Sequence, residues 1–277
     1  MAPLDQFYTK EEVAKECYTE LLDFTDKIKS QKIFIEPSAG TGSFFKLLPE
    51  NTRIGIDLEP KFPGIEKMDF FDYEYCRSRN NEIVIIIGNP PFGRVSSLAI
   101  NFFNHSTKFA DIIAFIIPRI FKRTSIQNKL NLNFHLHSSR DLPENGCFTP
   151  NMNAKCCFQI WERKEVPRSK IILPTVCDDF VFIKYGAKDS KNQPTVPELS
   201  QFDFAIKAFG SKCGEIFIEN LISLRPKSFH FIKSKIPVSI LINRLKQIDY
   251  SISTDTVRQN SLGKADLVKL YLEIKSS

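Results

Sequence analysis

Two runs of continuous apolar residues constrain the fold of this chain more than any other feature. Ile83–Ile87 and Ile112–Ile117 hold no polar side chain. Strands that are apolar on both faces belong to parallel sheets that helices cover on both sides. Shorter strand-like segments lie at Lys32–Ile35, Arg53–Asp57 and Ile65–Asp69. The sequence therefore predicts an α/β fold with a mostly parallel sheet.

The segments around this sheet complete the first part of the chain. Residues 10–29 have the spacing of an amphipathic helix, and Phe44–Leu48 is typical of a further helix. Asn133–Ser138 and Lys155–Trp161 are strand-like and are joined by a loop rich in Pro, Asn and Gly. We expect these two segments to form an antiparallel hairpin at the end of the sheet.

The pattern changes after residue 163. Asp179–Gly186 and Asp203–Gly210 are similar segments, which we interpret as paired strands of a small β-rich module. Two helices are expected after them, at Val238–Ile248 and Lys264–Ile274. The chain should thus consist of a domain at residues 1–163 and a second module at residues 164–277.

Charge is distributed unevenly between these two parts. Residues 1–163 contain 20 basic and 20 acidic side chains, whereas residues 164–277 contain 18 basic and 12 acidic ones. The second module therefore carries the whole net charge of +6. Such a basic module suits a polyanionic partner such as a nucleic acid. A solvated surface without a partner is the alternative.

Cysteine usage and hydropathy limit the cellular setting. The seven cysteines show no Cys-x-x-Cys spacing, so we expect reduced thiols and no metal site. The polar N-terminus does not resemble a signal peptide, and the apolar runs are too short to cross a bilayer. These features favour a soluble protein of the cytoplasm or another intracellular compartment.

A glycine-containing turn follows the first predicted strand. The string Glu-Pro-x-x-Gly-x-Gly places Glu36 at the end of the strand, with Gly40 and Gly42 in the turn. Glycines at this position let a ligand approach the backbone closely. Glu36 would repel a phosphate but attract a cation, such as the ammonium group of a methionine moiety. The turn is therefore a candidate site for a cationic cofactor.

Acidic residues end the next two predicted strands. Asp57 ends the second strand, where this type of fold binds ribose hydroxyl groups. Asp69 ends the third strand and could accept hydrogen bonds from an adenine amino group, with Phe70 against the ring. The alternative for this last pair is a buried phenylalanine beside a helix-capping aspartate.

The most informative motif is Asn-Pro-Pro-Phe, directly after the most apolar strand. Pro90 and Pro91 stiffen the turn and lack N–H groups. The Asn89 side-chain carbonyl and the Pro90 main-chain carbonyl can accept both hydrogens of an exocyclic amine, which directs the nitrogen lone pair toward a methyl donor. Phe92 would stack on the base that carries the amine. The motif predicts methylation of an amino group.

With these motifs the chain resembles adenine-N6 DNA methyltransferases that use S-adenosylmethionine, in particular small phage, bacterial and large-DNA-virus enzymes. The matching segments are Asp5–Lys10, Phe34–Phe44, Gly55–Asp57, Asn89–Phe92, Phe148 with Cys156–Trp161, Asp203–Gly214 and Ser261–Lys264. In these enzymes Tyr is frequent at the position of Phe92.

The resemblance carries specific expectations. It implies a Rossmann-like fold with a seven-stranded sheet and a target base flipped out of the nucleic acid. It also implies that Tyr8 and Thr9 close over the methionine end of S-adenosylmethionine, and that Phe148 supplies a second aromatic ring for the base. DNA is the favoured partner. An RNA adenine-N6 methyltransferase and a non-catalytic, nucleic-acid-binding subunit are the alternatives.

Overall fold

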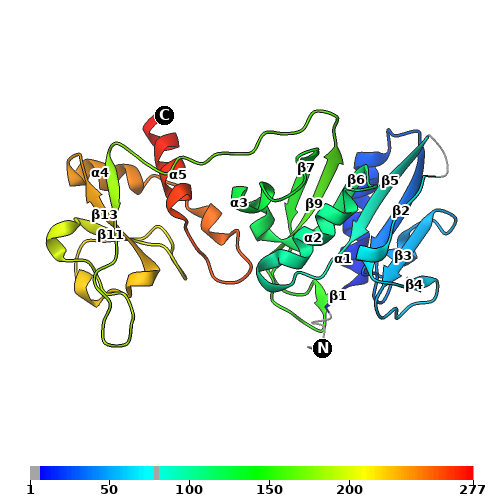
Figure 1. Ribbon diagram of the computed structural model, residues 1–277, viewed down its shortest axis with the longest axis horizontal. Coiled ribbons are helices and arrows are strands. Elements are labelled where there is room, and N and C mark those ends of the chain that lie inside the picture. The colour runs from blue at the N-terminus through cyan, green and yellow to red at the C-terminus, as the bar shows by residue number, and fades with distance from the viewer. Residues whose placement is uncertain (1–6, 78–80, 277) are drawn as a thin grey trace. The chain divides into compact units, whose positions relative to one another are not determined.

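A computed structural model describes residues 7–77 and 81–276 of the chain (Figure 1). The chain divides into two compact units, and the division falls after Lys170. The sequence pattern placed this boundary at residue 163, where the last strand of the first unit ends. The unit extends further because the following residues pack back on it. The Lys164 amide donates to the Asn133 carbonyl, and Arg168 Nε donates to the Phe134 carbonyl.

The first unit contains a seven-stranded sheet with the order β4-β3-β2-β5-β6-β9-β7. Strands β2 to β6 pair in parallel, and β9 is antiparallel to both β6 and β7. The predicted Rossmann-like sheet with an antiparallel hairpin is confirmed. Its elements are β1 (Tyr8–Thr9), α1 (Glu11–Thr25), β2 (Gln31–Pro37), β3 (Arg53–Asp57), β4 (Ile65–Lys67), β5 (Glu82–Gly88), α2 (Ser97–Ser106), β6 (Ile112–Pro118), α3 (Thr124–Gln127), β7 (Phe134–Asp141), β8 (Phe148–Thr149) and β9 (Cys156–Arg163).

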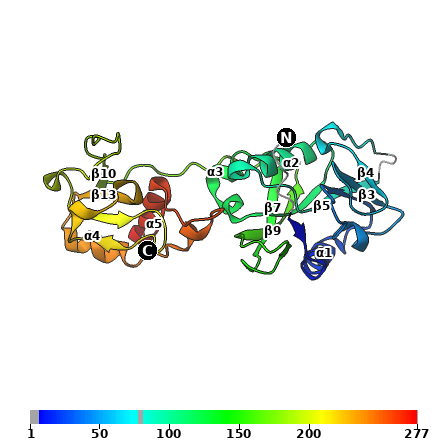
Figure 2. The same ribbon diagram turned by 90° about the horizontal axis from the view of Figure 1, so that it is seen from below.

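Alternate residues of the central strands bury their side chains on opposite faces of this sheet. Ile86 packs in a cluster with Phe103 of α2, whereas Ile87 packs in a second cluster with Leu21 of α1. Figure 2 shows α1 and α2 on opposite sides of the sheet. This arrangement explains why β5 and β6 are apolar throughout, since both of their faces are covered.

One predicted helix is much shorter than its pattern indicated. The segment expected to be helical at Phe44–Leu48 is a single turn of 3-10 helix, Phe45–Leu47. Leu48 has an extended backbone, with ψ of 148°. The cause is Pro49, because a proline disfavours helical geometry in the residue before it.

The second unit is built on a four-stranded antiparallel sheet with the order β10-β13-β11-β12. Its elements are β10 (Phe180–Ile183), β11 (Phe204–Lys207), β12 (Ile216–Phe217), β13 (Phe229–Ser234), α4 (Val238–Leu245) and α5 (Lys264–Ser276). The prediction that the two similar segments pair with each other was wrong, since β13 lies between β10 and β11. The small β-rich module with two helices is confirmed.

A buried carboxylate ties the second unit together. Asp179 precedes β10 and accepts hydrogen bonds from Arg244 of α4 and from Tyr271 and Lys275 of α5. These bonds hold the pKa of the Asp179 carboxyl below its ordinary value, first through the contact with Lys275. Among the residues that the structure describes, no helix of either unit is long and apolar enough to span a membrane.

Candidate functional site

The candidate site lies where the strand order of the first unit reverses. From β2 the chain builds outward through β3 and β4 on one side and through β5 and β6 on the other. Open parallel sheets bind ligands at the carboxyl ends of their strands, at this reversal. Glu36 lies near the end of β2, and Asn89 follows the end of β5. The two main motifs are therefore brought together at one edge of the sheet.

The turn after β2 has a backbone that few residues other than glycine adopt. Ser38, Gly40 and Gly42 have φ angles of +54°, +51° and +75°. A Cβ atom at Gly40 would lie 2.7 Å from Cε1 of the Tyr8 ring. Gly40 is thus required both by its backbone angle and by the close approach of Tyr8. The structure places the Tyr8 ring against this turn, and its contact with a cofactor stays a prediction.

Glu36 is buried, with 3% of its surface exposed. One carboxylate oxygen accepts a 2.6 Å hydrogen bond from the Phe45 amide, so the side chain fixes the start of the 3-10 helix. Gly88 of β5 faces it, because a Cβ atom there would lie 3.3 Å from Glu36 Cγ. Burial raises the pKa of the Glu36 carboxyl well above its ordinary value, despite the opposing hydrogen bonds from the Phe45 and Phe44 amides.

Because the pKa of Glu36 is raised, this residue should make the free energy of unfolding depend on pH. Glu36→Gln should reduce that pH dependence. Because the folded-state pKa lies above the unfolded-state value, the stabilisation from Glu36 is complete below the unfolded-state pKa. It is lost as the pH rises through the folded-state pKa. Glutamine can still accept the Phe45 hydrogen bond but carries no charge. Urea unfolding of both proteins at several pH values would give the free energy of unfolding. From acidic to neutral pH this free energy should fall more steeply for the wild type than for Glu36→Gln, and parallel curves would contradict a raised pKa for Glu36.

Asp57 organises the same turn from β3. Oδ2 accepts a hydrogen bond from the Gly40 amide at 2.7 Å, and Oδ1 accepts one from the Glu59 amide at 2.7 Å. A carboxylate can accept about four hydrogen bonds, so both oxygens keep capacity for a ligand hydroxyl. The side chain is half-buried.

Asp69 and Phe70 adopt the alternative arrangement considered from the sequence. Asp69 accepts a hydrogen bond from the Phe71 amide at 3.0 Å and caps a short 3-10 helix. Phe70 is 3% exposed and stacks on Phe102 of α2. Its ring belongs to the core and presents no free face to an adenine. The predicted contact between Phe70 and a cofactor is therefore not supported by this placement.

The Asn89 side chain is held by one of its two polar atoms. Nδ2 donates to the Phe7 main-chain carbonyl at 3.3 Å. Oδ1 is buried and has no hydrogen-bond partner among the described residues. A buried carbonyl oxygen without a partner is costly and rare in folded proteins. Pro90 is buried and Phe92 is half-buried against the α1 side of the core.

Strand β1 connects the turn with Asn89. The Thr9 carbonyl accepts a hydrogen bond from Ser43 Oγ at 2.6 Å, while the Phe7 carbonyl binds Asn89. Thr9 Oγ1 is also buried without a partner among the described residues. Sequence reasoning missed Phe7 and Ser43, because both contacts involve main-chain carbonyls, one in β1 and one in the residue before it. Asp5 and Gln6 of the N-terminal motif lie outside the described residues.

Phe148 lies close to this strand but is covered. It belongs to β8, which pairs antiparallel with β1, so that Thr9 is opposite Phe148. Its side chain is 1% exposed and packs in the same core cluster as Phe92. In this structure the ring offers no face to a base, and its role in base stacking stays a prediction.

No family model and no curated protein matches the chain. Among solved structures, similar ones include a protein of Pyrococcus horikoshii whose assignment as an RNA methyltransferase is provisional (16% identity, 58% of this chain and 88% of that one, TM-score 0.42). Others are a magnesium protoporphyrin IX methyltransferase of Synechocystis (11%, 56% and 79%, 0.40) and an N-methyltransferase of Bradyrhizobium japonicum (12%, 56% and 98%, 0.39). All three matches cover 56–58% of this chain and have TM-scores below 0.5.

Proposed function

We propose that the chain is an S-adenosylmethionine-dependent methyltransferase that acts on N6 of adenine in DNA. The first unit would bind the cofactor and carry out the transfer. The second, basic unit would contact the nucleic acid. The proposal rests on the residues of the candidate site and on the sequence resemblance that they carry.

The observation that carries this proposal is the state of the Asn89 side chain. Its amide nitrogen is engaged by Phe7, which leaves the buried carbonyl oxygen as the side-chain atom that still lacks a partner among the described residues. This atom is an acceptor, and an exocyclic amine supplies the matching N–H groups. The Pro90 carbonyl follows directly in the chain as the second acceptor of the proposed pair.

The residues at the turn fit S-adenosylmethionine. The loop between β2 and the 3-10 helix carries only neutral side chains, and the acidic Glu36 of β2 and Asp57 of β3 lie against it, which suits a cationic ligand better than a phosphate. Asp57 would accept the ribose hydroxyl groups, and Thr9, whose buried hydroxyl has no partner within residues 7–77 and 81–276, would bind the methionine end. Glu36 would hold the turn in place through the hydrogen bond that it accepts from the Phe45 amide.

The chain's own residues would then align the reaction. When bound, the cofactor supplies a methyl group that its sulfonium centre has already activated. Asn89 and the Pro90 carbonyl would hold the adenine amine so that its lone pair is directed at that group. Phe92 would stack on the flipped base. Two preorganised acceptors also stabilise the positive charge that develops on the amine during transfer.

Asp57→Ala should weaken cofactor binding. Loss of a hydrogen bond to a charged group costs about 1.5–3 kcal/mol, which corresponds to roughly a 10- to 150-fold higher Kd. The Gly40 amide also loses its acceptor, so the turn itself should loosen. Isothermal titration calorimetry with S-adenosylmethionine would measure the effect. Asp23→Ala, at an exposed position of α1, is the control, and equal affinities of the two variants would remove Asp57 from the site.

DNA binding by the full chain should fall steeply with salt. Residues 171–277 contain 15 basic and 11 acidic side chains, so phosphate contacts are expected from this unit. Each neutralised phosphate contributes about −0.9 to the slope of log affinity against log salt concentration. Fluorescence anisotropy with a labelled duplex at increasing salt would give this slope. An affinity for DNA that does not change with salt concentration would show that the basic side chains of this unit form a solvated surface and do not contact phosphates.

One experiment tests the proposed function directly. The protein is incubated with S-adenosylmethionine labelled in its methyl group and with either DNA or RNA, and the nucleic acid is then digested to nucleosides. N6-methyldeoxyadenosine from DNA is the expected product. N6-methyladenosine from RNA alone would change the substrate and keep the chemistry. A product methylated on a ring carbon or a ribose hydroxyl would refute the proposal.

A further inference from the structure

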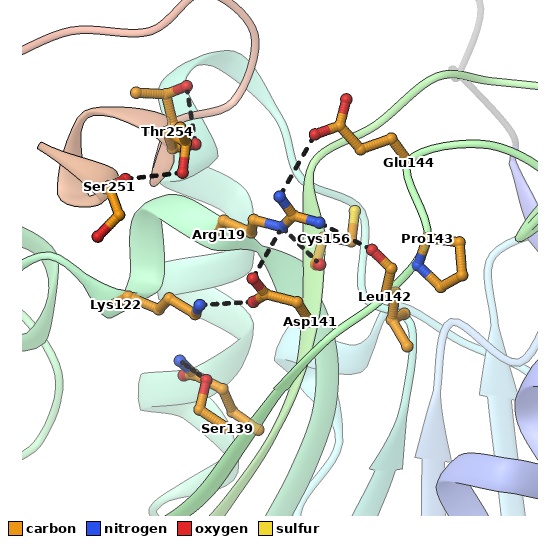
Figure 3. Close-up of polar contacts among 12 residues, drawn as sticks. Arg119, Lys122, Ser139, Asp141, Leu142, Pro143, Glu144, Cys156, Ser251 and Thr254 are labelled. Carbon is orange, nitrogen blue, oxygen red and sulfur yellow. Dashed lines mark hydrogen bonds and ion pairs between the residues drawn. The ribbon is translucent and has the colours of Figure 1, made fainter. Parts of the chain in front are cut away.

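Arg119 follows β6 at the same edge of the sheet as Asn89, and its side chain is only 13% exposed. Figure 3 shows its guanidinium group among polar partners from three segments of the chain. Nη2 donates to the Leu142 carbonyl at 2.9 Å, Nη1 to Glu144 at 3.3 Å and Nε to the Cys156 carbonyl at 3.4 Å. Asp141 forms an ion pair with Nε at 3.5 Å.

These partners lie in or next to the two ends of one loop, residues 142–155. The loop leaves the end of β7 and returns at the start of β9. The Leu142 amide donates to the Cys156 carbonyl, and the Arg119 amide donates to the Lys155 carbonyl. Arg119 thus joins both ends of the loop through its side chain and its main chain. A planar guanidinium with five donors can span such a set of acceptors, which a lysine ammonium cannot do.

The loop in turn holds the strand that orients Asn89. Strand β8 lies within the loop and pairs with β1, and the Lys10 amide donates to the Cys147 carbonyl at 3.0 Å. Next to this pairing, the Phe7 carbonyl accepts the hydrogen bond from Asn89 Nδ2. Hydrogen bonds and the short stretches of chain between them therefore connect Arg119, through the loop and β1, to the side chain that we place on the target amine.

We propose that Arg119 is a positioning residue for methyl transfer. It fixes loop 142–155, the loop holds β1 in place, and the Phe7 carbonyl beside β1 then orients the Asn89 side chain. The expected effect of Arg119 on the methyl-transfer rate rests on the proposed function. The expectation that Arg119 keeps β1 in place does not depend on that function. Arg119 itself would touch neither the target base nor the cofactor.

The test compares Arg119→Lys with a matched arginine at the opposite edge of the same sheet. Arg77 donates to the Glu82 carbonyl at 2.6 Å and pairs with Asp111 at 2.7 Å, where β5 and β6 begin. Amide hydrogen exchange followed by mass spectrometry reports on β1 and the loop. Exchange in peptides covering residues 7–10 and 142–155 should rise in Arg119→Lys, whereas Arg77→Lys should leave it unchanged. Strands β2 and β5 should stay protected in both.

The second readout is the methyl-transfer rate at saturating cofactor. A displacement of about 1 Å at a reacting group costs up to about 10²-fold in rate, so a fall of roughly 10- to 100-fold is expected for Arg119→Lys, with the cofactor Kd unchanged. Glu144→Gln, which alters an exposed partner of Arg119, should shift both readouts in the same direction by less. This variant carries the test if Arg119→Lys does not fold.

The outcomes separate this inference from the proposed function. Unchanged exchange at residues 7–10 would show that Arg119 does not hold β1 and would overturn the inference. Raised exchange together with a wild-type rate of methyl transfer would show that β1 does not orient the Asn89 side chain. This result would also overturn the inference. A wild-type protein that methylates no nucleic acid would refute the proposed function, and the exchange experiment would still decide whether Arg119 fixes β1.

Discussion

Asn89→Ala should lower the rate of methyl transfer by about 10²- to 10³-fold and leave the affinity for S-adenosylmethionine unchanged. Removal of one preorganised hydrogen-bonding group from an active site typically has an effect of this size. The affinity should persist because we place Asn89 on the target amine, whereas Glu36, Asp57 and Thr9 are placed on the cofactor. Single-turnover transfer from labelled cofactor to DNA would give the rate, and calorimetry would give the affinity.

A matched control exists at the other end of the same strand. Asn81 directly precedes β5 and accepts a hydrogen bond from Ser30, whereas Asn89 directly follows β5. Asn81→Ala should therefore transfer methyl groups at the wild-type rate. An Asn89→Ala protein as active as the Asn81→Ala protein would rule out the proposed mechanism. Thermal unfolding of both variants would show whether a lost rate reflects a lost fold.

The central sheet was predictable because its signal is local. β3 begins and ends at the predicted residues. β5 extends the predicted run Ile83–Ile87 by one residue at each end, and β6 extends the run Ile112–Ile117 by one residue at its end. Strands buried on both faces have a composition that no exposed segment shares. The order of the motifs along the chain also placed Glu36, Asp57 and Asn89 at one edge, since parallel strands present their carboxyl ends together.

The remaining features depend on contacts between distant segments. The composition of β10 and β11 does not reveal that β13 lies between them, because strand partners are chosen by tertiary packing. The same holds for Phe148, which stands in a polar loop and is nevertheless buried by its pairing with β1. Phe70 was ambiguous from the sequence, and its stacking on Phe102 of a later helix decides in favour of the core.

Phe92→Ala should weaken productive binding of the target base, whereas Phe92→Tyr and Phe92→Trp should keep most of the activity. Base stacking on an aromatic side chain is worth about 1–3 kcal/mol, so loss of the ring should reduce kcat/KM for DNA by roughly 5- to 150-fold. Tyrosine and tryptophan each retain an aromatic face. Steady-state kinetics with varied DNA at saturating cofactor would measure the three variants.

The control must separate stacking from packing, because Phe92 also contributes to the core. Phe24 of α1 is half-buried, like Phe92, and packs against the same cluster, but its ring lies against His137 of β7. Phe24→Ala should thus lose comparable packing without touching the target base. If both alanine variants lose stability equally and only Phe92→Ala loses kcat/KM, the ring acts on the substrate. Equal losses of kcat/KM would instead assign Phe92 to the core and leave the base without its proposed stacking partner.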